Sequence, residues 1–157
     1  MFNNQLKLIK IVGFLIIKIA GGTTPGKTYL SSRPDGFVDL DGQDNGSGRQ
    51  WWQFIQVLGN TYNIRVWSGT NPGEYLRSTA PGKVHLYNRD DGSGRQQWVL
   101  HHLGNSIYNI KIAGGTNPGK TYLGVTRDGT EVKLYSDDDN SGRQKWIIDP
   151  PPPVKSE

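Results

Sequence analysis

The pattern Ser-Gly-Arg-Gln-x-Trp occurs three times in this chain, and it constrains the fold more than any other feature. The three copies begin at Ser47, Ser93 and Ser141, so they are 46 and 48 residues apart. A fixed period of this size indicates one supersecondary unit used three times. A unit of about 46 residues buries too little apolar surface to be stable alone, so we expect the three copies to share one core.

The repeat extends well beyond this pattern. Upstream of each copy lies a block that runs through a turn into Tyr-Leu: Ile17–Leu30, Ile64–Leu76 and Ile110–Leu123. Between the two blocks lies a shorter shared stretch: Val38–Leu40, Val84–Leu86 and Val132–Leu134. We therefore expect one domain over residues 13–149, with repeats 13–57, 58–103 and 104–149, preceded by an extension (1–12) and followed by a proline-rich tail or linker (150–157).

Each repeat is expected to contain four short β-strands. Apolar residues alternate with polar ones between turns rich in Gly, Pro, Asn and Asp, which is the strand signature. In the middle repeat the expected strands cover 62–67, 75–78, 83–87 and 97–101. Three such units give about twelve strands, and closing them into a barrel removes exposed edges. The sequence therefore predicts an all-β fold.

The repeated pattern has a structural interpretation. Its tryptophans are expected to point into the core, with each indole N–H bound to a partner. Each glutamine lies two residues earlier, on the same face, and is expected to bind backbone in the preceding loop. The Asp and Ser side chains are expected to hold a tight turn. Each arginine follows an aspartate by five residues, which predicts an ion pair across that turn: Arg49 with Asp44, Arg95 with Asp90, and Arg143 with Asp138.

Three Gln-x-Trp motifs at this spacing resemble those of the ricin-type (R-type) β-trefoil lectin family, over roughly residues 13–149. The resemblance implies a β-trefoil fold and sugar binding in shallow pockets, up to one per repeat. Each family pocket uses an Asp near the second strand, an aromatic after the third strand and an Asn before the Gln. The Asp position holds Ser31, Arg77 and Gly124, and the Asn position holds Arg49, Arg95 and Arg143.

The aromatic position is kept in two repeats, as Tyr87 and Tyr135, whereas the first repeat has Asp41. If sugars bind, the pocket therefore differs from the family pocket, and the first repeat is the weakest candidate for a sugar site. A saccharide stacks its C–H faces on aromatics and hydrogen-bonds to planar polar groups, and arginine also favours acidic or sulfated glycans. The candidate sugar-binding residues are Tyr87, Asp90, Arg95, Tyr135, Asp138, Arg143, Asp44, Arg49 and His85.

Several other functions are not favoured. The net charge is only +4 and the basic residues are scattered, so no nucleic-acid footprint is present. The chain has no cysteine, which removes disulfides and thiolate chemistry. Its histidines do not recur between repeats or match a metal-ligand spacing, and no serine lies in a nucleophile elbow. We therefore expect no enzyme activity, no cofactor and no metal site.

The ends of the chain leave its location open. The apolar run Ile11–Ile17 resembles a weak signal peptide, but cleavage after Ala20 would remove a strand that the repeat needs. The run is also too short to span a membrane. We expect no signal peptide and no transmembrane segment, which is compatible with a secreted or a cytoplasmic protein.

Three functions remain as alternatives. The first is a lectin with two or three weak sites, whose partners are glycans and whose proline-rich tail could join it to an effector. The second is a protein-binding trefoil, such as a protease inhibitor, that uses the loops at 69–74 and 114–120. The third is a targeting domain of a larger toxin or hydrolase that does not bind sugar.

Overall fold

The computed structural model describes residues 13–67, 74–116 and 119–154, which form twelve β-strands. Within these residues no helix is long and apolar enough to cross a membrane. The strands are β1 (Ile17–Ile19), β2 (Tyr29–Ser32), β3 (Val38–Asp41), β4 (Trp52–Leu58), β5 (Thr61–Val66), β6 (Tyr75–Ser78), β7 (Val84–Tyr87), β8 (Trp98–Gly104), β9 (Ile107–Ile112), β10 (Tyr122–Val125), β11 (Val132–Tyr135) and β12 (Trp146–Ile148).

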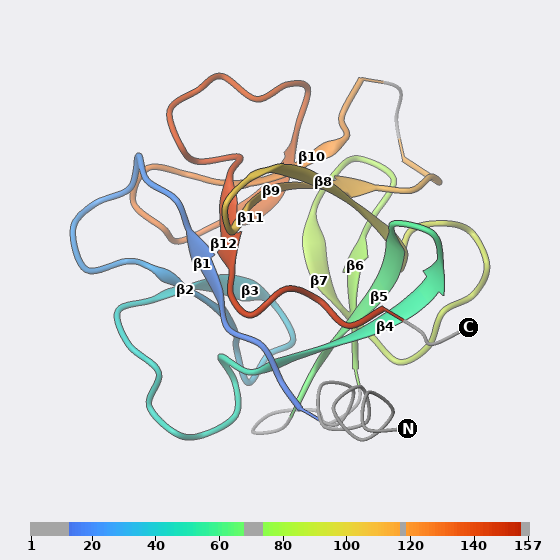
Figure 1. Cartoon of the computed structure of the whole chain (residues 1–157), viewed down its shortest axis with the longest axis horizontal. Helices are drawn as coiled ribbons and strands as arrows, with labels where there is room; N and C mark the ends of the chain where they lie inside the picture. The colour runs from blue at the N-terminus through green and yellow to red at the C-terminus, as the bar shows by residue number, and fades with distance from the viewer. Residues whose placement is uncertain (1–12, 68–73, 117–118, 155–157) are drawn as a thin grey trace.

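Six of these strands form a closed barrel (Figure 1). Antiparallel pairing runs from β1 through β12, β9, β8 and β5 to β4. In the described residues, one bridge joins β4 back to the segment just before β1. There Leu15 and Trp52 exchange both backbone hydrogen bonds, at 2.7 and 2.9 Å. This closure removes the unpaired edges that an open sheet would expose.

The other six strands form three hairpins, β2–β3, β6–β7 and β10–β11, which cover one end of the barrel. Each hairpin binds the next around the pseudo-threefold axis, through a leucine N–H and a turn glycine carbonyl 2.8–2.9 Å apart. The three bonds are Leu86 to Gly36, Leu134 to Gly82 and Leu40 to Gly129. A six-stranded barrel with three hairpins in cyclic contact is the β-trefoil architecture, so the predicted fold is confirmed.

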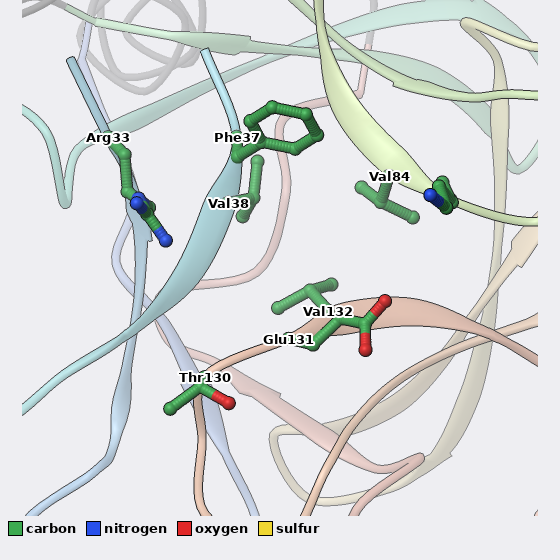
Figure 2. Close-up of a pocket in the computed structure, with 8 residues that line it drawn as sticks. Arg33, Phe37, Val38, Val84, Thr130, Glu131 and Val132 are labelled. Carbon is green, nitrogen blue, oxygen red and sulfur yellow. The ribbon is translucent and has the colours of Figure 1, made fainter. Parts of the chain in front are cut away.

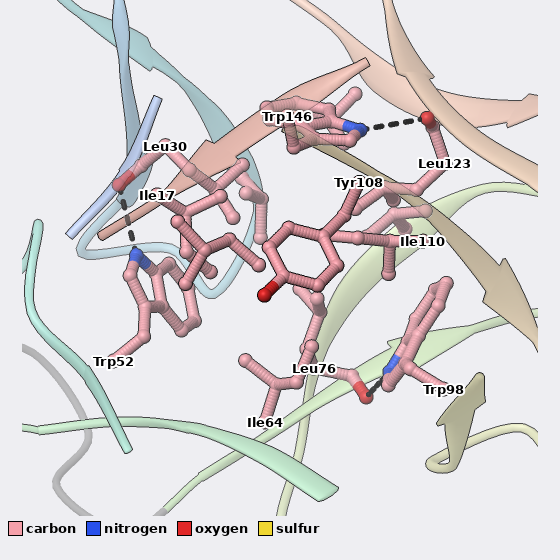
Figure 3. Packing of buried hydrophobic residues seen from close by; sticks show 14 of the residues in the cluster. Ile17, Leu30, Trp52, Ile64, Leu76, Trp98, Tyr108, Ile110, Leu123 and Trp146 are labelled. Atoms are coloured by element: carbon pink, nitrogen blue, oxygen red, sulfur yellow. Dashed lines mark hydrogen bonds between the residues drawn. The ribbon is translucent and has the colours of Figure 1, made fainter. Parts of the chain in front are cut away.

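The tryptophans of the repeated pattern occupy equivalent places in the core (Figure 3). All three are fully buried, and each indole N–H donates to a leucine carbonyl at 2.9 Å: Trp52 to Leu30, Trp98 to Leu76 and Trp146 to Leu123. The glutamines are also buried, and each Oε1 accepts a backbone N–H five residues earlier: Gln50 from Asn45, Gln96 from Asp91 and Gln144 from Asp139. Both predictions are confirmed.

In the middle repeat most strand bounds lie within one residue of the prediction, and two features of the chain differ more. Strand β8 continues to Gly104, three residues past the expected end, because its hairpin with β9 remains paired beyond the barrel. Pro152 is buried, so the first residues of the tail lie against the domain and do not simply leave it. The expected extension over residues 1–12 lies outside the described residues.

Candidate functional site

The three hairpins carry the positions at which the sequence analysis expected sugar pockets. Because the repeats share a backbone, these positions can be compared directly. The side chains around the buried glutamine of the Gln-x-Trp motif differ in every repeat, and they decide what each hairpin surface offers a ligand.

In the first repeat the polar groups satisfy one another. Gln50 Nε2 donates to Ser31 Oγ at 2.9 Å and lies 3.4 Å from Asp41 Oδ2. The other carboxylate oxygen of Asp41 accepts the N–H of Gly42 at 2.7 Å. No aromatic side chain stands at this position, so the surface offers neither a stacking face nor a free amide donor.

In the second repeat an arginine covers the aromatic. The guanidinium carbon of Arg77 lies 4.0 Å from the centre of the Tyr87 ring, a cation–π contact that occupies one ring face. Three buried nitrogens here have no hydrogen-bond acceptor: Arg77 Nε, Arg95 Nε and Gln96 Nε2. The tyrosine predicted to stack on sugar is therefore packed against an arginine that replaces the family carboxylate.

In the third repeat a glycine, Gly124, stands at the position of the family aspartate. A Cβ on Gly124 would lie 2.5 Å from Cδ1 of Tyr135 and 3.0 Å from the Arg143 carbonyl, so the tyrosine ring fills the space a side chain would take. Gln144 Nε2, buried beside it, has no hydrogen-bond acceptor. Burial raises the pKa of Tyr135, and the nearby positive charge of Arg143 opposes that effect.

The three aspartates of the candidate set hold the turns before β4, β8 and β12. In each, Oδ1 accepts the backbone N–H two residues later, at 2.9–3.0 Å. The other oxygen accepts from side chains: Asp44 from Trp51, Asp90 from Asn63 and Gln97, and Asp138 from Asn109 and Lys145. Burial acts to raise the pKa of Asp90 and Asp138, but these hydrogen bonds outweigh it and lower both values.

The predicted ion pairs between the arginines and these aspartates are wrong. Arg143 lies 3.8 Å from Asp139 instead, and its Nη1 donates to the Gly22 carbonyl of the first repeat at 3.0 Å. Arg95 likewise donates to Gly115 of the third repeat, at 3.2 Å. Asp90 and Asp138 accept from Asn63 and Asn109 instead, and the arginines of these two repeats bond across to the neighbouring repeat. Arg49 is half-buried. The loop of the second repeat that is equivalent to the loops bonded by Arg95 and Arg143 lies outside the described residues.

His85 is half-buried on β7, where its Nδ1 lies 3.1 Å from the Leu86 carbonyl oxygen. Its ring centre is 6.0 Å from that of Phe37 in the first repeat. Burial, aided by the positive charge of Arg77, lowers the pKa of this histidine even though the contact with Leu86 acts in the opposite direction. The candidate residues therefore do not form three equal sites: the first repeat lacks an aromatic, and the cation over the tyrosine is closer in the second repeat (Arg77, 4.0 Å) than in the third (Lys133, 5.6 Å).

Two arrangements were not found from the sequence. A cation from a barrel strand lies over the first tyrosine of every hairpin: Lys18 on Tyr29, Arg65 on Tyr75 and Lys111 on Tyr122, at 4.8–5.5 Å. The signal was present, because a basic residue recurs inside each first strand. Phe14 also stacks on Trp51 at 4.2 Å and lies 5.9 Å from Trp67. Phe14, the common partner of both tryptophans, gave no periodic signal in the sequence.

Two depressions lie near these surfaces. One, of about 200 Å³, lies where the hairpins meet, with Val38, Val84 and Val132 at its base and Phe37 and Glu131 at its edge (Figure 2). None of the candidate sugar-binding residues lines it. The other, of about 530 Å³, lies between the third and first repeats and includes Arg143 among its lining residues.

Two further expectations concern the protease-inhibition loops and metal binding. The loops considered for protease inhibition include residues 69–73 and 117–118, which lie outside the described residues. In the part of the chain that is described, no group of three or more histidine, aspartate or glutamate side chains is arranged to hold a metal ion.

Two solved structures share this architecture. The crystal structure of ThreeFoil, a designed 3-fold symmetric protein, gives a TM-score of 0.64 at 24% identity, covering 87% of this chain and 97% of that one. SeviL bound to the asialo-GM1 saccharide gives a TM-score of 0.63 at 14% identity, covering 87% of this chain and 95% of that one. No protein-family model and no curated protein matches the chain. These likenesses establish the β-trefoil fold.

Proposed function

We propose that this chain is a carbohydrate-binding β-trefoil module of the R-type lectin kind, with its main sugar surface in the third repeat. The observation that carries the proposal is the setting of Tyr135. Its ring is half-exposed and packs against Gly124, which holds it in place. A positioned aromatic surface suits the apolar face of a sugar ring.

Polar groups around Tyr135 supply the donors that sugar hydroxyls require. The ammonium of Lys133 lies 5.6 Å from the ring centre, and Arg143 comes from the adjoining turn. These groups can orient a sugar that stacks on the ring.

The other two repeats support weaker sites or none. The first lacks an aromatic, and its amide donor is already bonded to Ser31. In the second, Arg77 occupies one face of Tyr87. The comparison with SeviL adds support, because that protein has the same fold and is bound to a saccharide. Under this proposal Asp44, Asp90 and Asp138 stabilise their turns and do not bind sugar hydroxyls.

A single shallow site of this kind binds weakly, so useful affinity requires several copies on one surface. We propose that clustering, or attachment to an effector through the proline-rich tail, supplies this avidity. Under this proposal the module positions or cross-links glycan-bearing surfaces and performs no catalysis itself.

The test compares two tyrosines at equivalent positions. Tyr135→Ala is expected to weaken glycan binding about tenfold or more, because stacking and orientation are both lost. Tyr87→Ala is the matched control, and it is expected to have a much smaller effect. Binding is measured on a glycan array with pre-clustered protein, and circular dichroism verifies that both variants are folded. Equal binding by the wild type and Tyr135→Ala would remove the site assignment, and a blank array from folded protein would remove the proposed function.

A further inference from the structure

The depression of about 530 Å³ between the third and first repeats shares Arg143 with the proposed sugar surface. Its lining comes from the β1–β2 loop, the β10–β11 turn and the turn before β12: Gly22, Thr23, Thr24, Pro25, Arg127, Ser141 and Arg143. Two of these residues are cationic and none is acidic. Three hydroxyl groups complete the lining.

The two arginines are held differently. Arg143 is half-buried and spans the boundary between the repeats, since its Nη1 donates to the Gly22 carbonyl at 3.0 Å. The side chain of Arg127 is exposed, and within the described residues it makes no hydrogen bond or ion pair. Its backbone is nevertheless anchored, because the Arg127 carbonyl accepts from Thr24 N at 2.8 Å and from Thr24 Oγ1 at 3.2 Å. A free guanidinium therefore projects from a fixed point of the rim.

Nearby carboxylates do not neutralise this guanidinium. Asp128 directs Oδ1 toward the hydroxyls of Thr126 and Thr130, both at 2.8 Å. Asp139 lies 3.8 Å from Arg143, and its Oδ1 accepts the Ser141 N–H at 2.9 Å. Both acids stay charged, but neither lies within ion-pair distance of Arg127, so the donors of its guanidinium are free for a ligand.

An arginine at this turn position is found in one of the three described hairpin turns. The hairpin turns begin alike, because a glycine N–H donates to the carbonyl three residues earlier in each, at Arg33, Thr79 and Thr126, although the third turn is one residue longer. The residue after each of these carbonyls is Pro34, Ala80 or Arg127, so only the third repeat supplies an arginine here. The shared fold does not require this arginine, since proline and alanine serve at the same position.

We propose that this depression binds the acidic group of a glycan, a sulfate ester or a carboxylate, while a neutral residue of the same glycan rests on Tyr135. The inference depends on the proposed function. Arg143 connects the two surfaces, because its backbone carbonyl and the Tyr135 ring both border Gly124 while its guanidinium reaches Gly22. A planar guanidinium forms paired hydrogen bonds with sulfate or carboxylate oxygens.

The experiment measures binding to one glycan backbone in three forms: neutral, sulfated and sialylated. The wild type is expected to bind at least one acidic form more tightly than the neutral form, and added salt is expected to reduce that preference. Arg127→Ala is expected to lower acidic-glycan affinity about five- to tenfold and leave neutral binding unchanged. Arg89→Ala removes the same charge from an exposed arginine outside the depression, so it is expected to change neither.

The outcomes separate the two proposals. A response confined to the sulfated or the sialylated form supports the inference and identifies the acidic group. Neutral binding that depends on Tyr135, with no acidic preference or with a preference that Arg127→Ala leaves intact, overturns the inference and retains the proposed function. Absence of binding to every form, by folded protein, overturns both.

Discussion

Asp44, Asp90 and Asp138 occupy one position in three repeats, yet different donors satisfy each carboxylate. In the second and third repeats a buried asparagine on the barrel strand donates to it, at 2.9 and 3.0 Å. In the first repeat that strand position is Ile16, and the indole N–H of Trp51 donates instead, at 2.7 Å. The turn therefore needs a satisfied carboxylate but does not need a particular partner.

Asp138 makes the acid stability of the fold testable. Burial acts to raise the pKa of Asp138, but bonding to Asn109 and Lys145 outweighs burial and lowers the pKa below the ordinary 3.8. The carboxyl group is therefore harder to protonate in the folded chain than in the unfolded chain. The stabilisation is complete above that ordinary value and is lost as pH falls through the folded pKa. Asp138→Asn is expected to cost about 1–3 kcal/mol near pH 7 and progressively less in acid. Urea denaturation across pH measures this, and a constant difference between variant and wild type would contradict it.

At the scale of elements, the barrel is closed unevenly. In the described residues, β4 meets the segment just before β1 through one bridge, between Leu15 and Trp52, whereas the equivalent junctions β5–β8 and β9–β12 each pair two residues. The aromatic cluster of Phe14, Trp51 and Trp67 lies beside this seam, and Trp67 N–H donates to the Trp51 carbonyl at 2.7 Å. The equivalents of Trp51 in the other repeats are Gln97 and Lys145, which stand beside junctions that each pair two residues, β5–β8 and β9–β12.

Trp51→Ala is expected to loosen this seam and to lower the free energy of unfolding by about 1–3 kcal/mol, because the stacked ring of Phe14 loses its partner. Hydrogen exchange of the Leu15 and Trp52 amides is expected to accelerate, while amides of the β8–β9 ladder keep their protection. Trp51→Phe keeps an aromatic ring for stacking on Phe14 but loses the hydrogen bond to Asp44. This variant therefore distinguishes the effect of stacking from the effect of the hydrogen bond. Unchanged seam exchange in Trp51→Ala would exclude a sealing role for the cluster.

At the scale of the whole molecule, the repeats hold one another through close backbone contacts. Gly142 of the third repeat has a φ of 96°, and a Cβ there would lie 2.9 Å from backbone atoms of Gly21 in the first repeat. Gly94 makes the same approach to Gly114, joining the second repeat to the third. Together with the cyclic bonds between hairpins, these contacts make three short units into one cooperative domain.

Gly142→Ala is therefore expected to destabilise the molecule more than an ordinary glycine replacement. Gly46→Ala is the matched control, because Gly46 also has positive φ, at 79°, but a Cβ there meets nothing within 4 Å. The control is expected to cost about 1–2 kcal/mol from backbone strain. Gly142→Ala is expected to cost about 1–3 kcal/mol more from the clash between repeats. Equal losses in urea denaturation would show that the contact between Gly142 and Gly21 does not join the repeats.

The sequence alone was sufficient to predict the threefold period, the twelve strands and the buried Trp and Gln of each unit, because alternation, turns and motif spacing are local properties that repeat. It also identified the positions that the hairpin surfaces would present. Only the tertiary structure decided their state: Arg77 lies on Tyr87, Tyr135 fills the space over Gly124, and Arg143 reaches Gly22 instead of Asp138. These outcomes depend on which long side chain reaches which neighbour across strands and repeats, and no local pattern encodes that competition.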